Sequence, residues 1–329
     1  MSAPADRGSP GRAVLRLGGR MAEQAREVLE GRKEPAPPRD AATVMLLRSA
    51  GLGQADAGRG GLGQADAGRA GLGQADAGRA GLGQADAGRG DKDSIEVYML
   101  RRAPSMAFGP GAYVFPGGSV DPRDTSGEVA WAGPGAAEWG AVLAAPPDLA
   151  RALVCAAVRE TFEESGVLLA GPSPDQVVAD TRGEDWEADR HALLDRSLSL
   201  ADLLGRRRLV LRADLLTPWA RWVTPVTEQR RYDTRFFAAA LPAGQRTRDV
   251  GGEADRVAWV QPGEAIAAAR RGEIQLMPPT AVTLAELAAC RGVHGALGER
   301  RRITAVVPEV VMAEGAVWLT MPADLEYPL

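Results

Sequence analysis

Three glutamates near the middle of the chain are spaced so that they could share one divalent cation. The segment RETFEESGV at residues 159–167 contains Glu160, Glu163 and Glu164. On a helix, positions i, i+3 and i+4 lie on one face, which brings the three carboxylates together. Like charges at these spacings repel by roughly 0.2–0.5 kcal/mol per pair, so the cluster is a poor choice for helix stability alone. Mg²⁺ and Mn²⁺ prefer such oxygen ligands, and Mg²⁺ usually completes its coordination with substrate phosphates. A solvated acidic helix face is the alternative.

Two neighbouring features favour a metal and phosphate site over that alternative. Arg159 precedes Glu163 by one helical turn, where its guanidinium can hold the carboxylate in orientation. The segment YVFPGGSVD at residues 113–121 places Gly117 and Gly118 after an aromatic, strand-like run. Glycines there allow a tight turn and a close approach of the backbone to a phosphate. An ordinary turn explains the glycines equally well when they are taken alone.

The patterns around these segments predict a layered α/β domain. Strands are expected at residues 41–48, 94–101, 219–226, 232–241, 256–260, 303–311 and 317–321. Helices are expected at residues 147–166, 183–205, 263–271 and 280–289. The first helix would have Asp148 as its N-cap and would stop at Gly166. Strands and helices interleaved in this way are typical of layered α/β folds.

The predicted catalytic domain spans residues 39–329 and carries low-complexity appendages. Residues 1–38 are rich in Gly, Pro, Ala, Arg and Glu, and we expect this arm to be largely disordered, with room for a short helix at residues 21–29. A ten-residue unit beginning GLGQADAGR occurs four times over residues 51–90. Each copy offers a single leucine, which is too little apolar surface for a stacked solenoid. We therefore expect a flexible insertion that expands a hairpin loop, at a closure cost that rises only slowly with length.

Composition excludes several other classes of protein. The 329 residues are 45% hydrophobic and 25% charged, and the net charge of −4 comes from interspersed acids and bases, so no nucleic-acid partner is expected. With only Cys155, Cys290 and two histidines, a disulfide framework and the usual zinc sites are excluded. The N-terminal residues contain arginines but no uninterrupted apolar segment of signal-peptide length, no run of about 20 apolar residues occurs, and the last three residues are not Ser-Lys-Leu. These features predict a cytoplasmic location and no membrane association.

The glycine and glutamate segments together resemble the Nudix box, G-x(5)-E-x(7)-R-E-U-x-E-E-x-G-U, in which U is a bulky aliphatic residue. The matching residues are Gly118, Arg159, Glu160, Glu163, Glu164, Gly166 and Val167. Two departures stand out. The position of the first box glutamate falls on Asp124, and residues 125–158 separate it from Arg159 where the box has seven residues. Thr161 also occupies the first aliphatic position.

A box that is interrupted in this way is similar to that of the Nudix branch containing the peroxisomal coenzyme A diphosphatases. The similarity extends over roughly residues 40–329, apart from the repeats. Supporting segments are WVTP at 222–225, RRYDTRFF at 230–237, PPT at 278–280 and MPADLEYP at 321–328. The resemblance implies a Nudix fold, which is an α/β/α sandwich around a mixed β-sheet. This fold would carry a helical insertion, the disordered repeat insertion and an insertion at residues 125–146 within the box.

The resemblance also implies an activity, namely hydrolysis of a diphosphate linkage with Mg²⁺ or Mn²⁺ in a small molecule such as coenzyme A or an acyl-coenzyme A. The expected metal ligands are Glu160, Glu163 and Glu164, and the expected catalytic residues are Arg159, Glu163 and Glu164. Gly117 and Gly118 would bind substrate.

Two further residues are candidates with equally ordinary alternatives. Arg231 could meet a substrate phosphate, but alternation along a strand places it on one face with Asp233 and Arg235, where an internal ion pair competes. Glu253 could be a further ligand or the general base, as in many Nudix enzymes, or a surface loop acid.

Other functions of the same fold stay open at this point. The chain could act on a dinucleotide or a nucleotide sugar, or could be a non-catalytic Nudix module that senses a ligand or a partner. The complete set of three glutamates and the arginine argues against the non-catalytic alternative, because a sensor has no need of the full cluster. Nothing in the sequence indicates an oligomeric state.

Overall fold

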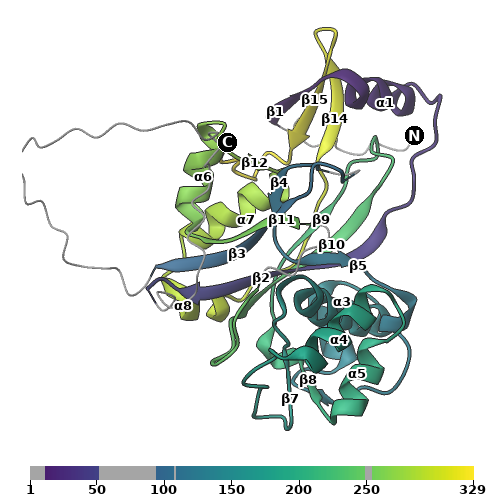
Figure 1. Ribbon diagram of the computed structural model, residues 1–329. Coiled ribbons are helices and arrows are strands. Elements are labelled where there is room, and N and C mark those ends of the chain that lie inside the picture. Colours follow the sequence, from purple (N-terminus) through teal and green to yellow (C-terminus); the bar gives the residue numbers. More distant parts are fainter. Residues whose placement is uncertain (1–11, 52–93, 107–108, 249–253) are drawn as a thin grey trace, which may run out of the picture.

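The computed structural model describes residues 12–51, 94–106, 109–248 and 254–329. A mixed β-sheet forms the middle layer, with helices on both of its faces (Figure 1). Its strands are β2 (Arg39–Ser49), β3 (Ile95–Arg102), β4 (Ala112–Val114), β5 (Gly117–Ser119), β9 (Thr217–Val223), β10 (Tyr232–Ala240), β11 (Ala254–Val260), β12 (Gln275–Leu276) and β13 (Ala305–Val306). Among the described residues the order is β12-β4-β3-β2-β10-β9-β13, with β5 paired to β2 and β11 to β3. The predicted α/β/α sandwich is confirmed.

Alternation along β2 divides the hydrophobic core into two halves. The helices that take part are α3 (Pro147–Ser165), α6 (Pro262–Arg270), α7 (Pro278–Ala288) and α8 (Gly292–Gly298). Ala42, Val44 and Leu46 pack in the cluster that contains α3. Met45 and Leu47 pack in the cluster that contains α6, α7 and α8. Because successive side chains of a strand point to opposite faces, a central strand covered on both sides must be apolar almost throughout.

Strands β2 and β3 form the antiparallel hairpin that the sequence predicts. Leu47 lies opposite Val97, Ser49 lies opposite Ile95, and the Ala50 N–H donates to the Ser94 carbonyl at 2.8 Å. Apart from Gly51, the decapeptide repeats at residues 51–90 lie outside the described residues. The connection therefore leaves and re-enters the fold at two adjacent points.

Deleting residues 51–90 is expected to preserve both the melting temperature and the turnover. Residues 91–93 would then join Ala50 to Ser94, which are already hydrogen-bonded, and a shorter loop loses less entropy on closure. Thermal unfolding and kcat would be measured beside a variant that carries a scrambled segment of the same composition. A melting temperature lowered by more than about 4 °C, which corresponds to roughly 1 kcal/mol or more, would show that the repeats are structural.

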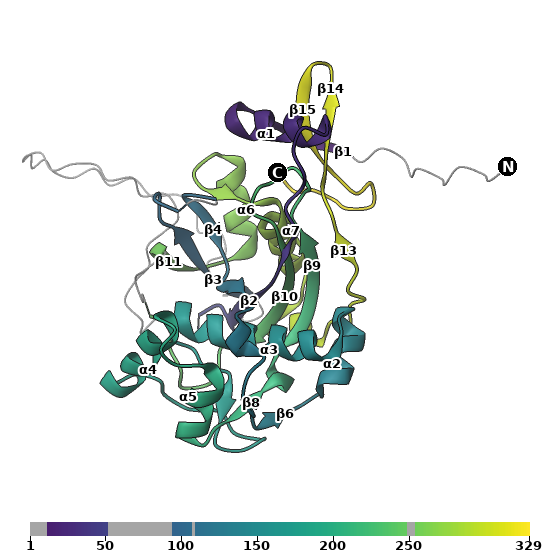
Figure 2. The same ribbon diagram turned by 90° about the vertical axis from the view of Figure 1, so that its right-hand side faces the viewer.

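Helix α3 lies under the sheet, at the centre of a layer that also contains short strands and smaller helices (Figure 2). These elements are η1 (Pro122–Asp124), β6 (Trp131–Ala132), α2 (Ala136–Leu143), β7 (Ala170–Gly171), α4 (Glu184–Leu194), α5 (Leu200–Arg207), β8 (Val210–Arg212) and η2 (Ala213–Leu215). The single helix predicted at residues 183–205 is two helices. Arg196 adopts a left-handed backbone with φ 66°, and the Ser199 side chain caps α5 by accepting from the Asp202 N–H at 3.0 Å.

The two ends of α3 differ in how well the sequence predicted them. The helix begins with Pro147 in its first turn after the N-cap Pro146, so the prediction of Asp148 as the N-cap is wrong. Proline at the first helical position already has the required φ, and Asp148 instead lies in the first turn, where a negative charge is favourable. The helix stops at Gly166, whose φ of 73° is the left-handed C-terminal conformation expected of glycine.

No single helix of the described chain is long and apolar enough to cross a membrane, although the bent pair α2–α3 meets those criteria of length and composition.

The prediction of a largely disordered N-terminal arm is wrong for residues 12–20, whereas the short helix considered at residues 21–29 is present and residues 1–11 lie outside the described residues. The arm forms β1 (Arg12–Leu17) and α1 (Gly19–Leu29), which lie beside β14 (Glu309–Ala313) and β15 (Ala316–Met321) at the top of Figure 1. Strand β1 pairs antiparallel with β15, so that Leu17 lies opposite Val317. Leu17 and Ala25 are buried. The partner that orders the arm is thus supplied by the other end of the chain, which local composition does not reveal.

The single strand predicted at residues 303–311 is also two strands, β13 and β14, in different sheets. Strand β13 pairs with β9, whereas β14 pairs with β15. Pro308 lies between them, and proline lacks the N–H that a continuous strand would use in its ladder.

Candidate active site

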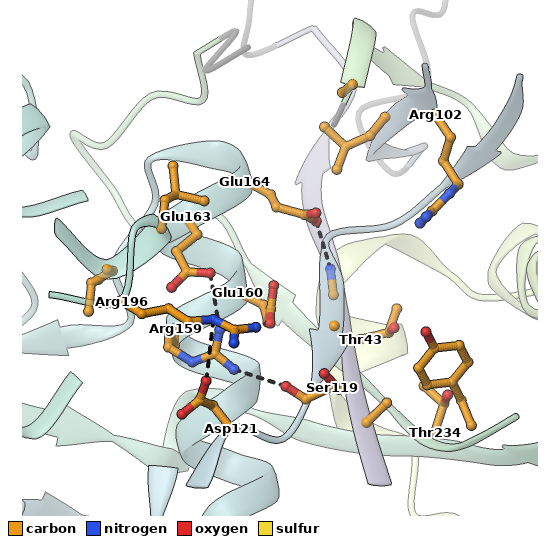
Figure 3. A pocket seen from close by; sticks show the side chains of 18 of the residues that line it. Thr43, Arg102, Ser119, Asp121, Arg159, Glu160, Glu163, Glu164, Arg196 and Thr234 are labelled. Atoms are coloured by element: carbon orange, nitrogen blue, oxygen red, sulfur yellow. Dashed lines mark hydrogen bonds and ion pairs between the residues drawn. The ribbon is translucent and has the colours of Figure 1, made fainter. Parts of the chain in front are cut away.

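A cavity of about 420 Å³ lies between α3, β5 and the sheet (Figure 3). Helix α3 lines it with Arg159, Glu160, Glu163 and Glu164, and β5 lines it with Gly117, Gly118 and Ser119. Strands β2, β3, β10 and β11 and the end of α4 complete the wall. The fold therefore gathers around one hollow the two segments that the sequence singled out, together with others far from them in the chain.

The three glutamates of α3 all reach this cavity from one side, as their helical spacing predicts (Figure 3). Glu160 accepts from Arg159 at 2.7 Å, and Glu164 accepts from the Gly117 N–H at 2.8 Å. Glu163 accepts from Arg159 at 3.0 Å through one oxygen, while its buried Oε1 has no hydrogen-bond partner among the described residues. Burial, followed by the negative charge of Glu160, raises the pKa of Glu163 to about 7.

Arg159 is the hub of a buried ion network, and it orients Glu163 as predicted. Only 6% of Arg159 is exposed. Its guanidinium donates two hydrogen bonds to Asp124, each of 2.9 Å, and one to the Ser119 carbonyl at 3.1 Å. Burial by itself would lower the pKa of Arg159, but the hydrogen bonds to Asp124 and the charge of Glu160 raise it above its ordinary value. The guanidinium is thus firmly cationic and held in one place.

Asp124 is a site residue to which the sequence analysis assigned no role. It ends η1, is 3% exposed, and directs its carboxylate at Arg159. In the resemblance to the Nudix box it stands at the position of the first glutamate. The residues between Asp124 and Arg159 contain β6 and α2, and the two side chains meet in spite of that insertion. The position of Asp124 in the Nudix box could have indicated its role. The long segment between Asp124 and Arg159 in the sequence hid their contact.

Gly117 and Gly118 lie in the wall of the cavity, but not in the tight turn that their spacing suggested. They belong to β5, which pairs antiparallel with β2. A Cβ at Gly117 would lie 2.5 Å from the Ala42 carbonyl oxygen, and a Cβ at Gly118 would lie 2.6 Å from the carboxylate carbon of Glu160. Glycine is therefore required at position 117 by close packing against the backbone of β2, whereas a larger residue at position 118 would displace the Glu160 carboxylate.

Gly118→Ala is expected to lower kcat by about 10- to 100-fold, because the new methyl group must displace the Glu160 carboxylate and small displacements at a reacting centre have costs of this size. The matched control is Gly263→Ala, where a Cβ would meet nothing within 4 Å. The measurement is kcat at saturating metal and substrate, with the melting temperature of both variants. Equal turnover of the two variants would contradict the packing role of Gly118.

The prediction that Arg231 binds substrate is not supported, because the residue does not line the cavity. Its guanidinium donates to the carbonyls of Thr224 at 3.1 Å and Ala36 at 2.7 Å. The alternative of an internal ion pair holds for Arg235, which is buried and lies 2.8 Å from Asp233. The residues of β10 that do line the cavity are Tyr232 and Thr234, on the opposite face of the strand. Glu253 lies outside the described residues, and its role stays a prediction.

Four charged residues of the cavity escaped the sequence analysis. They are Arg102, Asp121, Arg123 and Arg196. Arg123 donates to Asp121 at 2.9 Å, and this hydrogen bond lowers the pKa of Asp121 to about 2. Arg102 extends toward the cavity from the end of β3, on the wall that faces α3 (Figure 3). Asp121 and Arg123 belong to η1 and its N-cap, whereas Arg102 and Arg196 come from distant segments, so no local pattern marks the four as one group.

The carboxylate oxygens of this cavity are chemically suited to a hard divalent cation, although they do not converge on one point as they would around a bound metal ion. Within the described part of the chain, no three His, Cys, Asp or Glu side chains are arranged as a metal-binding group. Glu160 and Glu163 are drawn to Arg159, and Glu164 to the Gly117 N–H. The buried, unpartnered Oε1 of Glu163 and the carboxylate chemistry favour Mg²⁺ or Mn²⁺ over a softer metal. A cation would compete with Arg159 for Oε1 of Glu160 and Oε2 of Glu163.

Comparisons with known proteins agree with the fold. A family model described as the NUDT19 Nudix domain matches residues 135–287, which include all of α3. The chain is 27% identical over 277 residues to "Acyl-coenzyme A diphosphatase NUDT19" of Xenopus laevis, and this match covers 71% of each chain. It is 32% identical over 234 residues to the protein of the same name from Gallus gallus, covering 58% of this chain and 61% of the relative.

A solved structure shares the architecture. The crystal structure of a Nudix hydrolase from Alicyclobacillus acidocaldarius aligns with a TM-score of 0.56 and 24% identity, and the alignment covers 81% of this chain and 98% of that one. At this level of identity the likeness shows the fold. The carboxylates on α3 face paired glycines across a cavity in a fold shared with that Nudix hydrolase, and residues 135–287 are similar in sequence to the NUDT19 Nudix domain.

Proposed function

We propose that this chain hydrolyses the diphosphate linkage of coenzyme A or an acyl-coenzyme A, in a reaction that requires Mg²⁺ or Mn²⁺. The names of the frog and chicken relatives supply the substrate class. The structural observation that carries the proposal is that three glutamates on one face of α3 line the cavity. One of them, Glu163, has a buried Oε1 without a hydrogen-bond partner among the described residues. A helix face built for stability alone would not leave that oxygen without a partner.

In the proposed mechanism Glu160, Glu163 and Glu164 hold the cation, and Arg159 keeps the carboxylates of Glu160 and Glu163 oriented. A bound divalent cation would neutralise charge on the diphosphate and make water a better nucleophile. Arg159 is itself restrained by Asp124 and by the Ser119 carbonyl, so it can orient Glu163 without moving when substrate binds. The backbone of Gly117 and Gly118 would face the phosphates across the cavity. Glu253 stays the candidate for the proton acceptor.

We also propose a reducing compartment such as the cytoplasm, and a small molecule as the binding partner. Both cysteines are free thiols, and Cys155 is a buried residue of α3 in the core. Burial raises the pKa of Cys155 to about 12, which keeps the thiol protonated and unreactive. The acids and bases lining the cavity are balanced, which suits a diphosphate with its metal better than a polyanionic strand.

A panel of diphosphates tests the proposed function. Coenzyme A, an acyl-coenzyme A, a dinucleotide and a nucleotide sugar would each be incubated with the protein and Mg²⁺ or Mn²⁺, and kcat/KM measured from the released products. We expect the two coenzyme A compounds to have the highest values, and no reaction with a chelator present. A preference for the dinucleotide or the sugar would assign a different Nudix pyrophosphatase. Binding of a panel member without hydrolysis would assign a sensing module.

A further inference from the structure

A second cavity adjoins the one that contains the glutamates. Its volume is about 530 Å³, and it shares Ser119, Asp121 and Arg196 with the first cavity. The remaining wall includes Arg39, the first residue of β2, and Asp40 beside it. The two cavities therefore adjoin at these three residues, and the glutamates of α3 line only the first.

A substrate cut at a central diphosphate needs room on both sides of the linkage. Pockets for drug-sized ligands span roughly 300–1,000 Å³, and the first cavity lies near the lower limit with about 420 Å³. Coenzyme A is larger than such ligands. When its diphosphate lies against α3, one half of the molecule must extend beyond the first cavity, and the second cavity begins at Ser119 and Asp121.

The charges of the second cavity indicate which half it receives. Both of its acids already have arginine partners outside the second cavity, since Asp121 is bound by Arg123 at 2.9 Å and Asp40 lies 3.2 Å from Arg235. Arg39 and Arg196 are thus left as cations whose charge the cavity does not cancel.

Arg196 is well suited to exchange its present contact for an anion. Its side chain is 74% exposed and lies 3.7 Å from Asp121, which is beyond hydrogen-bond distance. Exposed ion pairs of this kind contribute little, so the contact with Asp121 is easily given up. The left-handed backbone at Arg196, with φ 66°, places this residue at the junction of the two cavities.

We propose that the second cavity binds the phosphorylated nucleoside half of the substrate, and that Arg39 and Arg196 contact its 3′-phosphate. This assignment rests on the proposed coenzyme A diphosphatase function. The other half of the substrate then extends along the first cavity, past the apolar side chains of Leu100 and Val257. Arg39 and Arg196 act as specificity residues, which distinguish coenzyme A from its 3′-dephospho form.

The test compares coenzyme A with 3′-dephospho-coenzyme A in the full-length protein with Mg²⁺. The variant is Arg39→Gln/Arg196→Gln. The matched control is Arg206→Gln/Arg208→Gln, which removes the same charge elsewhere. Arg206 has a similarly long ion pair of 3.6 Å with Asp189, and Arg208 has a left-handed backbone with φ 54°.

The wild type is expected to prefer coenzyme A. The Arg39→Gln/Arg196→Gln variant should lower kcat/KM for coenzyme A by about 10- to 100-fold, mainly through KM, as expected for the loss of hydrogen bonds to a charged group. The loss with the dephospho form should be smaller, so that the preference falls, whereas the control variant keeps it. A wild type without preference, or a variant that keeps it, would overturn the subsite. Failure of the wild type to cleave either compound would instead overturn the proposed function.

Discussion

Glu163→Gln is expected to lower kcat by about 10²- to 10⁴-fold, which is about 3–5 kcal/mol of transition-state stabilisation. The substitution would remove one of the three proposed carboxylate ligands and a negative charge that would balance the proposed metal. The amide has the same shape, and its oxygen can still accept from Arg159, which now donates to Glu163 at 3.0 Å. The fold should persist, because the change also removes a negative charge beside Glu160.

The measurement is kcat at saturating coenzyme A and Mg²⁺, together with the melting temperature and the far-ultraviolet circular dichroism spectrum. Glu264→Gln is the matched control, since Glu264 is an exposed glutamate in the first turn of α6. Turnover of the Glu163→Gln variant within about threefold of the control, which is less than 1 kcal/mol, would refute the assignment of Glu163 as a ligand.

Arg159→Ala is expected to destabilise the protein by about 3–5 kcal/mol, the usual cost of removing one partner from a buried ion network. The side chains of Asp124 and Glu163 are 1% and 6% exposed, and the variant would leave both carboxylates buried without the guanidinium. The free energy of unfolding would be measured by urea denaturation. Arg182→Ala is the matched control, because Arg182 also forms a bidentate ion pair with an aspartate, Asp180. That pair is exposed, with side chains 55% and 45% exposed. We expect at most about 1 kcal/mol there.

A double-mutant cycle with Asp124 separates the ion pair from other effects of Arg159. The variant Arg159→Ala/Asp124→Ala should be more stable than the sum of the two single changes predicts, by about 1–3 kcal/mol, because it leaves one uncompensated charge fewer. Strictly additive losses would show that the two side chains are not coupled, which would contradict the 2.9 Å hydrogen bonds between them.

Much of the fold could be predicted because its signals are local. Residues 41–48 form a near-continuous apolar run, and the structure places them in β2 at the centre of the sheet. Two predicted elements, the strand at residues 303–311 and the helix at residues 183–205, are each divided in the structure by a residue that interrupts the regular backbone. Pro308 separates β13 from β14, and the left-handed Arg196 separates α4 from α5.

The disagreements at the site have a different origin, because they concern contacts between distant segments. The prediction for Arg231 followed from its charge and from its place near a strand, but its orientation depends on the residue after β9 and on the chain before β2, whose carbonyls it binds. The glycines of β5 were read as a turn, since their requirement comes from neighbours in β2 and α3 that lie elsewhere in the sequence.

By itself, the sequence determined that one helical turn would present Glu160, Glu163 and Glu164 on a common face, with Arg159 beside them and Gly166 ending the helix. That result needs only the period of the α-helix, which acts within a few residues. Only the tertiary structure decided that Asp124 would restrain Arg159 across an insertion, that β1 would pair with β15, and that Arg39 and Arg196 would line the same cavity. Those contacts depend on how whole elements pack against one another, and no local spacing encodes that.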